Sequence, residues 1–268
     1  MAIIKYTAAV NKIRRSWNMI SGHYVRSYPI SDSIIHFGPL CPGEDKLKIL
    51  GNIRGKRVLE LGCGAGQNSV ALSRAGAIVT AVDFAEAQLE KGRLLAFKND
   101  MNIEFIAGDI SDLSQFKKNG FDIAFSACSI SFIKNIEKTF SEIHRVVKPD
   151  GRLILSDMHP LQYILDEIEG GVTFNHRFPY KPITMRWSWD FEARNGHKSL
   201  SAGFKHYVRS LSYFHNALVD AGFAVSRILE PKSTRQTPHR GFSREIWREY
   251  KYIAEHLPIT YIMVCERQ

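Results

Sequence analysis

The chain has 268 residues, of which 44% are hydrophobic and 24% charged, and its formal net charge is +9. These proportions are ordinary for a globular protein, and no apolar run approaches the roughly 20 residues that span a bilayer, which argues against a transmembrane protein. The first charged residue is Lys5, and no apolar segment with a small-residue cleavage site follows, so we expect no signal peptide and a cytoplasmic location.

The positions of the cysteines and of the basic residues limit which metals, disulfides and partners we expect. Cys41, Cys63, Cys128 and Cys265 are far apart in the chain and form no Cys-x-x-Cys pair, which argues against a zinc site, any other metal site or a disulfide framework. The basic residues are spread over the N-terminal helix, the region after residue 160 and the C-terminal third, without a dense block. A nucleic-acid partner is therefore disfavoured but stays open, as does the choice between monomer and homodimer.

The first 50 residues predict helices. Apolar residues recur at intervals of three and four, on one face of an amphipathic helix, at Val10, Ile13, Trp17, Ile20 and Tyr24. This face either packs on the core alone, or the helix end and the loop from Tyr24 to His36 also cover a ligand cleft. A second, short helix is predicted from Glu44 to Leu50.

A glycine-rich turn follows the first predicted strand. Val58, Leu59 and Leu61 predict a buried strand, after which glycines stand at positions 62, 64 and 66. A helix is predicted from Gln67 to Ala75, with Gly76 ending it. Such a strand–turn–helix presents backbone N–H groups and a positive dipole end to a ligand. The dinucleotide fingerprint fits poorly, because the third glycine comes one residue early and Gln67 replaces its small residue.

Alternating strands and helices continue to residue 156. Strands are predicted at residues 78–82, 103–106, 121–126 and 152–156, and helices at 85–99 and 135–147. This order predicts a doubly wound α/β fold with a parallel sheet covered on both faces. Ligands bind at the carboxyl ends of such strands, so the glycine turn should meet Asp83, Asp109, residues 126–128 and residues 157–159 at one edge.

The pattern changes after the fifth strand. Residues 160–205 are irregular and rich in aromatic side chains, with a strand predicted at Met185–Asp190 and a hairpin turn at Arg194–His197. We interpret this region as an antiparallel lid. A helix ending at Gly222, strands at residues 223–229 and 259–264, and an amphipathic helix at Ser243–His256 should complete the fold.

Taken together, these segments resemble the small-molecule, type-11-like branch of the class I S-adenosylmethionine (SAM) dependent methyltransferases, most closely over residues 45–160. The matching runs are Val58–Asn68, Val82–Phe84, Gly108–Ile110, Phe121–Ile123 and Arg145–Gly151. The resemblance implies a seven-stranded, mostly parallel sheet whose last strand inserts antiparallel. It also implies a helical cap at 1–50, a SAM-binding core at 51–160, a substrate lid at 161–207 and a C-terminal completion of the sheet at 208–268.

The resemblance also implies a cofactor site for SAM, with S-adenosylhomocysteine as product. Backbone at residues 62–64 would hold the methionine end, Asp83 the ribose, Asp109 and Ile110 the adenine, and Ser126 with Ala127 the amino-acid side. The full expected set is Tyr24, Glu60, Gly62, Cys63, Gly64, Gly66, Asn68, Asp83, Phe84, Gln88, Asp109, Ile110, Ser126, Ala127 and Ser131. Two of these residues have simpler readings, Asp83 as a solvated turn residue and Asp109 as a cap of the turn at residues 111–113. Ser131 departs from the family pattern, which often has a histidine there.

The sequence says less about the methyl acceptor than about the cofactor. Methyl transfer from a sulfonium needs alignment above all, and a hydroxyl nucleophile also needs a base. His159, just past the fifth strand, is the first candidate base, and His176 and His206 in the lid come next. Aromatic walls bury flat rings, so we expect a small aromatic or hydrophobic acceptor with an oxygen or nitrogen nucleophile. The expected acceptor residues are Tyr28, Cys128, His159, Trp187 and Trp189.

Three other functions compete with this interpretation. A nucleic-acid methyltransferase, for example one that acts on tRNA or rRNA, would use the basic surface. Amino-directed DNA methyltransferases carry Asp/Asn-Pro-Pro-Tyr/Phe after the fourth strand, whereas residues 126–129 here read Ser-Ala-Cys-Ser. A nicotinamide-dependent oxidoreductase is disfavoured by Gln67. A non-catalytic SAM-binding module stays open, because no residue of the sequence is certain to be catalytic.

Overall fold

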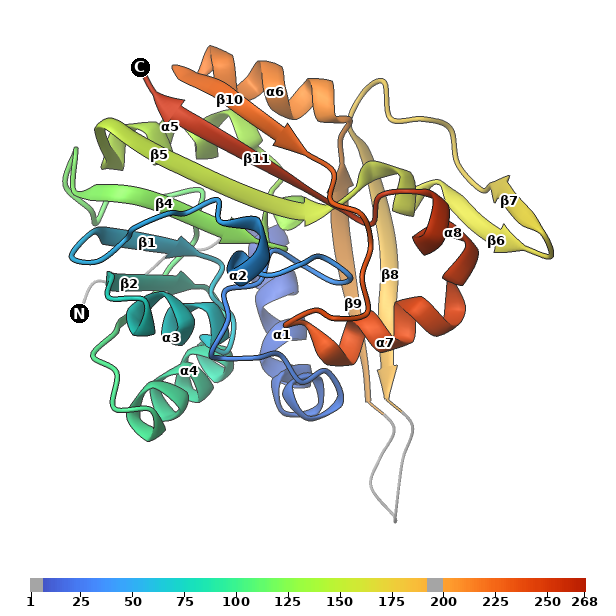
Figure 1. Cartoon of the computed structure of the whole chain (residues 1–268), viewed down its shortest axis with the longest axis horizontal. Coiled ribbons are helices and arrows are strands. Elements are labelled where there is room, and N and C mark those ends of the chain that lie inside the picture. Colours follow the sequence, from blue (N-terminus) through green and yellow to red (C-terminus); the bar gives the residue numbers. More distant parts are fainter. Residues whose placement is uncertain (1–6, 192–199) are drawn as a thin grey trace.

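A mixed sheet forms the centre of the computed structural model, which describes residues 7–191 and 200–268. Seven strands of this described part pair in the order β10-β11-β5-β4-β1-β2-β3 (Figure 1). Their bounds are β1 Arg57–Leu61, β2 Ile78–Asp83, β3 Glu104–Ala107, β4 Phe121–Ala127, β5 Val147–Met158, β10 Phe223–Leu229 and β11 Thr260–Arg267. Neighbours from β3 to β5 are parallel, and β11 runs antiparallel to both β5 and β10. The predicted doubly wound sheet with an antiparallel last strand is confirmed.

Helices cover both faces of this sheet because its buried strands are apolar on both sides. Leu59 and Leu155 share one apolar cluster with Phe140 and Phe214 of the helices α5 and α6. Neighbouring strand residues point the other way, into a second cluster with α3 and the segment around Phe37. The helix bounds are α3 Gln67–Arg74, α4 Glu86–Lys98, α5 Ile136–Val146 and α6 Leu211–Asp220. Each of these four was predicted within two residues at either end.

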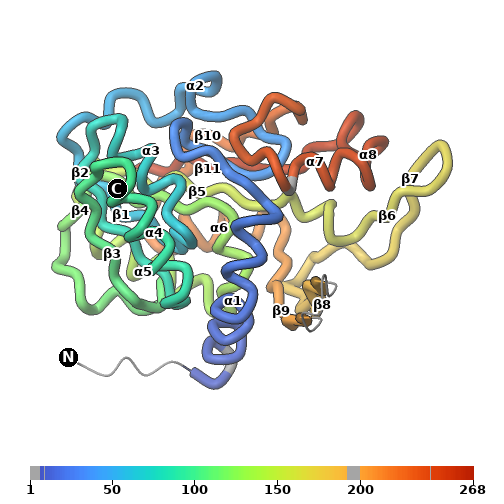
Figure 2. The backbone as a smooth tube through the Cα atoms, turned by 90° about the horizontal axis from the view of Figure 1, so that it is seen from below, coloured from blue at the N-terminus to red at the C-terminus, as the bar shows by residue number. Residues whose placement is uncertain are grey.

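The N-terminal helix α1 (Ala8–Ser27) lies between α4 and β9 and contacts both (Figure 2). Its predicted apolar face is buried at Ile13 and Ile20. The following helix α2 spans only Glu44–Leu47, because Lys48 adopts a left-handed conformation with φ 50°. The Glu44 carboxylate then accepts hydrogen bonds from the next turn instead of letting the helix continue. Among the described helices, none is long and apolar enough to cross a membrane.

The region after β5 contains two antiparallel hairpins, β6–β7 and β8–β9. Their strands are β6 Leu165–Ile168, β7 Gly171–Phe174, β8 Ile183–Phe191 and β9 Leu200–Val208. The strand predicted at residues 185–190 lies within β8, whereas the hairpin turn predicted at residues 194–197 lies outside the described residues. The β6–β7 hairpin was not predicted. Its four-residue strands are too short to show a clear alternation.

Two further predictions are wrong in detail. The single helix predicted at residues 243–256 is two helices, α7 (Arg240–Glu249) and α8 (Lys251–His256), which break at Tyr250 (φ −130°, ψ 45°). The break lets the Glu167 carboxylate of β6 accept a hydrogen bond from the Ile253 N–H in the first turn of α8. Likewise, β5 begins at Val147 rather than residue 152, and its pairing with β4 shifts register where residues 148–151 bulge out.

Candidate functional site

The three glycines after β1 serve three different needs. All have positive φ, 72° at Gly62, 53° at Gly64 and 77° at Gly66. A Cβ added at Gly62 would lie 2.3 Å from the Cβ of Ser129, and one at Gly66 would lie 3.0 Å from the Cα of Gly92. A Cβ added at Gly64 would meet no atom of the described chain within 4 Å. Gly62 and Gly66 are therefore required by close packing, whereas Gly64 borders open space.

Asp83 ends β2 directly beside this turn. Its Oδ2 accepts a hydrogen bond of 2.9 Å from the Gly64 N–H, and its Oδ1 accepts one of 2.8 Å from the Ala85 N–H. Burial raises the pKa of this carboxyl to about 6. Each carboxylate oxygen can accept a second hydrogen bond. Asp83 can therefore still grip a pair of ligand hydroxyls.

A first cavity opens above the glycine turn, and most of the residues expected to bind a cofactor line it. Those that do are Tyr24, Glu60, Gly62, Cys63, Gly64, Asn68, Asp83, Phe84, Gln88, Ile110 and Ala127. They come from α1, the ends of β1, β2 and β4, the first turns of α3 and α4, and the loop after β3. The convergence of strand ends at one edge, predicted from the sequence, is what brings them together.

Four residues of the expected cofactor set do not line this cavity. Gly66 packs beneath the turn, and Asp109 Oδ1 accepts hydrogen bonds from the N–H and hydroxyl of Ser111, as the simpler reading of that residue predicted. Ser126 is fully buried, with its hydroxyl 2.7 Å from that of Ser129. Ser131 instead lines a second cavity described below. Gly66 thus serves packing alone, and the side chains of the other three residues point elsewhere.

Two polar groups of the first cavity stand out by their burial. The Ser69 hydroxyl donates to the buried Glu60 carboxyl, and burial raises the pKa of Glu60 to about 8. Gln88 is also buried, and within the described part of the chain its Oε1 has no hydrogen-bond partner. An unpaired buried acceptor is costly, so a ligand donor at this position would be favoured.

Two histidines that sequence analysis did not single out also line the first cavity. Asn68 holds the backbone of His36 at both ends, with its Oδ1 2.8 Å from the His36 N and its Nδ2 3.0 Å from the His36 O. The rings of His36 and His239 meet edge to face, with centroids 5.1 Å apart. Burial lowers the pKa of both, that of His239 to about 4. Both lie in loops without a motif, and only the covering loop up to residue 36 was predicted.

A second cavity of about 410 Å³ lies between α1, the β8–β9 hairpin and the loops after β4 and β5. Four of its residues, Cys128, Trp187, Trp189 and His206, were expected to bind or convert an acceptor. The Trp187 ring stacks on Phe204, with centroids 4.8 Å apart. Tyr28, also expected there, lines neither cavity. Its hydroxyl accepts a hydrogen bond of 3.0 Å from the Trp189 Nε1 and so fixes that ring.

His206 is the candidate base that the structure brings to this cavity. Aromatic rings of Phe132, Tyr163 and Trp187 surround it, with centroids 4.5 to 5.3 Å from its own. Within the described chain neither of its ring nitrogens has a hydrogen-bond partner. Burial lowers its pKa to about 3, so the ring is neutral at pH 7. A neutral imidazole offers one donor and one acceptor to whatever enters.

The other two candidate histidines lie elsewhere. His159 caps the short helix η2 (Pro160–Tyr163), since its Nδ1 accepts a hydrogen bond from the Leu161 N–H and its Nε2 lies 2.9 Å from Glu230 Oε1. Both ring nitrogens are thus engaged, and the residue lines neither cavity. His176 is exposed beyond β7 and lines neither cavity. Proximity to a strand end in the sequence did not determine where these side chains point.

Asp157, at the carboxyl end of β5, lines the second cavity although it was not named individually from the sequence. Its Oδ2 accepts a hydrogen bond of 2.9 Å from the Ser131 N–H, and its Oδ1 accepts one of 2.8 Å from the Met158 N–H. Burial raises the pKa of Asp157 to about 6. Its position at a strand end was the signal that could have identified it.

One wall is common to both cavities. It consists of Trp17, Tyr24, Cys128, Phe132 and His239, which line the first cavity on one side and the second on the other. The backbone of Cys128 is left-handed, with φ 56°, a conformation that residues other than glycine rarely adopt. The two cavities therefore adjoin at the end of β4, where a group could pass from one ligand to another.

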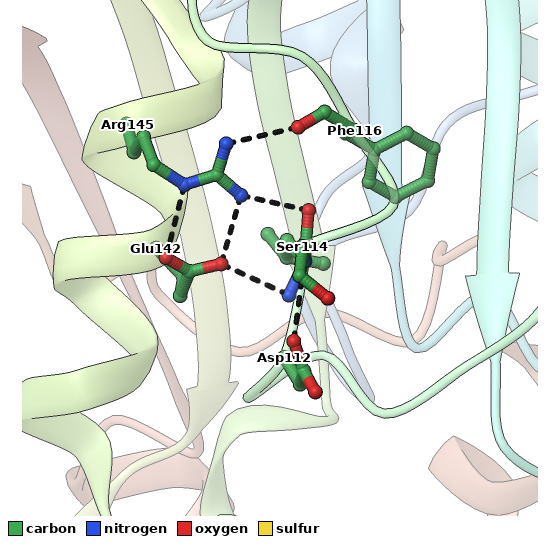
Figure 3. Close-up of polar contacts among 6 residues, drawn as sticks. Asp112, Ser114, Phe116, Glu142 and Arg145 are labelled. Carbon is green, nitrogen blue, oxygen red and sulfur yellow. Dashed lines mark hydrogen bonds and ion pairs between the residues drawn. The ribbon is translucent and has the colours of Figure 1, made fainter. Parts of the chain in front are cut away.

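An arginine on α5 holds the loop that carries Ile110 into the first cavity (Figure 3). Arg145 donates from Nη1 to the Phe116 carbonyl at 2.9 Å and from Nη2 to the Leu113 carbonyl at 2.8 Å. The same guanidinium forms a two-pronged ion pair with Glu142, one turn earlier on the helix. The loop after β3 is thereby fixed to α5.

Comparison with known proteins identifies the chain. A family model described as a methyltransferase domain matches residues 59–155. The uncharacterized methyltransferase YbaJ of Bacillus subtilis is 30% identical over 184 residues, which cover 67% of this chain and 70% of that protein. The chain is a class I SAM-dependent methyltransferase.

Two further proteins are similar to this methyltransferase, one in sequence and one in fold. A demethylmenaquinone methyltransferase of Clavibacter sepedonicus is 38% identical over 109 residues, which cover 39% of this chain and 42% of that protein. The crystal structure of a SAM-dependent methyltransferase from Mesorhizobium loti superimposes with a TM-score of 0.63 at 20% identity, over 82% of this chain and 94% of that one. The second similarity shows the fold alone.

SAM is the cofactor of this family, and the donors and acceptors of the first cavity fit it. Gly64 leaves room where a side chain would stand, Asp83 has acceptors to spare, and the Gln88 Oε1 lacks a partner within the described residues. The cavity encloses about 120 Å³. This volume is below the ~300 Å³ or more that ligand sites usually measure.

Proposed function

We propose that this methyltransferase moves a methyl group from SAM to an oxygen or nitrogen atom of a small, flat and largely apolar acceptor. The observation that carries the proposal is the shared wall, which separates a cavity with nucleoside-binding chemistry from an aromatic one. An in-line transfer needs donor and acceptor next to each other, and the adjoining of the two cavities at the end of β4 supports this arrangement.

Residues of the first cavity would hold the cofactor as follows. Asp83 would accept hydrogen bonds from the ribose hydroxyls, and the backbone at residues 62–64 would contact the methionine end. Ile110 would pack against the adenine, and the Gln88 Oε1 would accept a hydrogen bond from a cofactor N–H or O–H. When bound, SAM supplies a methyl carbon already activated by the sulfonium. The rings of Trp17 and Tyr24, in the shared wall, are placed to face a positive charge.

Residues of the second cavity would align the acceptor and keep water out. Trp187 and Trp189 provide flat apolar surface, and alignment of this kind contributes up to ~7–11 kcal/mol in favourable cases. The neutral His206 would accept a hydrogen bond from the nucleophilic O–H or N–H and orient its lone pair. For a hydroxyl acceptor, Asp157, whose pKa burial raises to about 6, would take the proton, a contribution of ~10²–10⁴ in rate.

A relative supports the flat acceptor. The demethylmenaquinone methyltransferase of C. sepedonicus acts, by its name, on demethylmenaquinone, and its similarity covers 39% of this chain. Because this similarity covers less than half of the chain, the acceptor of this protein is inferred from its own aromatic cavity.

The decisive experiment supplies methyl-labelled SAM and pools of phenols, quinols, aromatic amines and aliphatic controls to the purified chain. We expect labelled product and S-adenosylhomocysteine from a flat acceptor. In the double variant Trp187→Ala/Trp189→Ala, the acceptor KM should rise at least tenfold while SAM affinity stays within twofold. Loss of SAM affinity as well would mean that the two rings are structural. SAM binding without turnover of any acceptor would instead favour a non-catalytic SAM-binding module.

A further inference from the structure

A basic groove of about 880 Å³ lies on the outer side of α7, and it shares no lining residue with either cavity. Its cations come from α2, from the loop before α7, and from α7 and α8, segments far apart in the chain. They are Lys46, Arg235, Arg240, Arg244, Arg248 and Lys251. Asp45 is the only acidic residue among the groove's lining residues. The fold thus gathers a charge cluster that the sequence spreads out.

Three of these cations form a stripe along one helix. Arg240, Arg244 and Arg248 follow one another at intervals of four residues, so all project from the same side of α7. Successive members are about 6 Å apart along the axis, since an α-helix rises 1.5 Å per residue. All three are exposed. Like charges at this spacing repel one another, so the stripe is stabilised by a partner with a row of negative charges.

Acidic neighbours neutralise only part of this charge. Asp45, Glu249 and Glu255 lie 3.6 to 3.8 Å from Lys46, Arg248 and Lys251 in exposed ion pairs. Arg235, Arg240 and Arg244 have no ion pair within the part of the chain that the structure describes. These three guanidinium groups are available to an anion.

The groove also contains an aromatic ring. Trp247 lies between the arginines of the stripe, and the Arg235 guanidinium sits 4.7 Å from the centre of its ring. A positively charged groove with an aromatic side chain for stacking is the chemistry by which proteins hold single-stranded nucleic acids. A flat lipid surface would not follow a groove, and one small phosphate group would not reach cations spread over three segments.

We propose that this groove binds a single-stranded nucleic acid through its phosphates, with a base near Trp247. The proposal does not depend on the proposed acceptor, because the groove and the two cavities have separate linings. In the sequence the basic residues are spread out, which disfavours a nucleic-acid partner. The fold brings six of them together in this groove, which favours one.

The test measures binding of fluorescein-labelled, mixed-sequence 15-nucleotide RNA and DNA by fluorescence anisotropy, from 50 to 300 mM NaCl. The variant carries Arg235→Gln, Arg240→Gln and Arg244→Gln. We expect its affinity at 50 mM salt to fall at least tenfold. The slope of log K against log salt should become shallower by about 2, because each phosphate contact to a single strand contributes about 0.7.

A matched control removes the same charge elsewhere, with Lys98→Gln, Lys117→Gln and Lys118→Gln, all exposed and none of them lining the groove. It should change the affinity less than twofold. Equal losses in both triple variants would mean that net charge alone attracts the oligonucleotide, and would overturn the proposal. So would absence of binding by the natural chain, or tighter binding of anionic vesicles or an acidic protein than of both oligonucleotides. Thermal midpoints and SAM affinity check that each variant is folded, and Arg244→Gln alone should still reduce the slope by about 0.7.

Discussion

The substitution Gly64→Ala tests whether Gly64 borders the cofactor, in contrast to Gly62 and Gly66, which are required by packing within the turn. A Cβ at this position would meet no atom within 4 Å in the described chain, so the substitution brings no overlap. It does place alanine at φ 53°, in the left-handed region, which costs about 1–2 kcal/mol. For a chain of this size that corresponds to a fall in Tm of roughly 2–8 °C.

Binding should suffer much more than stability. The new methyl group would stand where the cofactor approaches the backbone, so we expect SAM affinity to fall at least tenfold, or about 1.4 kcal/mol. Isothermal titration calorimetry with SAM and S-adenosylhomocysteine, alongside thermal unfolding without ligand, measures both effects on the same preparation.

Gly62→Ala provides the contrast. Its Cβ would lie 2.3 Å from the Ser129 Cβ, and overpacking of this kind adds about 1–3 kcal/mol to the left-handed strain. Ser129→Gly removes the offending atoms, so the double variant should recover much of the lost stability. If Gly64→Ala binds SAM within twofold of the natural chain, or is destabilised as much as Gly62→Ala, the assignment of Gly64 to the cofactor is refuted.

Four other substitutions test single groups. Burial raises the pKa of Glu60 from its ordinary 4.5 to about 8, so the folded state keeps a proton that the unfolded state releases. Stability should therefore fall as pH rises from about 4.5 to 8, by at most ~5 kcal/mol, and Glu60→Gln should flatten this trend in urea unfolding curves. Asp157→Asn should lower kcat/KM for a hydroxyl acceptor ~10²–10⁴-fold with SAM affinity unchanged, because it removes the carboxylate that would take the proton. His159→Asn should instead lower stability and leave kcat within twofold; the reverse pattern would restore His159 as the base. Tyr28→Phe removes the hydrogen bond to Trp189, worth about 0.5–1.5 kcal/mol, and should raise the acceptor KM roughly 2–10-fold in steady-state assays, whereas an unchanged KM would show that the ring needs no support.

The fold was predictable because its signals are local and redundant. Short apolar strands such as Val58–Leu61 alternate with amphipathic helices, and each strand end carries a glycine or polar residue. One failed prediction depends on a distant contact. The helix predicted at 243–256 breaks because Glu167, from a hairpin more than 80 residues away, binds the start of α8.

The residues of the first cavity could be predicted from the sequence better than those of the second. Residues tied to strand ends and to the glycine turn, such as Asp83, line the first cavity as expected. Lid residues depend on how the β8–β9 hairpin packs against α1, which no local pattern specifies. Hence His206 enters the second cavity, His176 does not, and His36 and His239 were missed because they reach the site from unpatterned loops.

The place of β11 has a consequence for synthesis on the ribosome. Its residues, Thr260–Arg267, are inserted between β5 and β10, yet they are translated about 100 residues after Met158 completes β5. At ~5–20 residues per second, the edge of β5 stays unpaired for roughly 5–20 s. A nascent chain of this protein therefore offers an open strand to chaperones or to neighbouring copies until its final segment emerges and closes the gap.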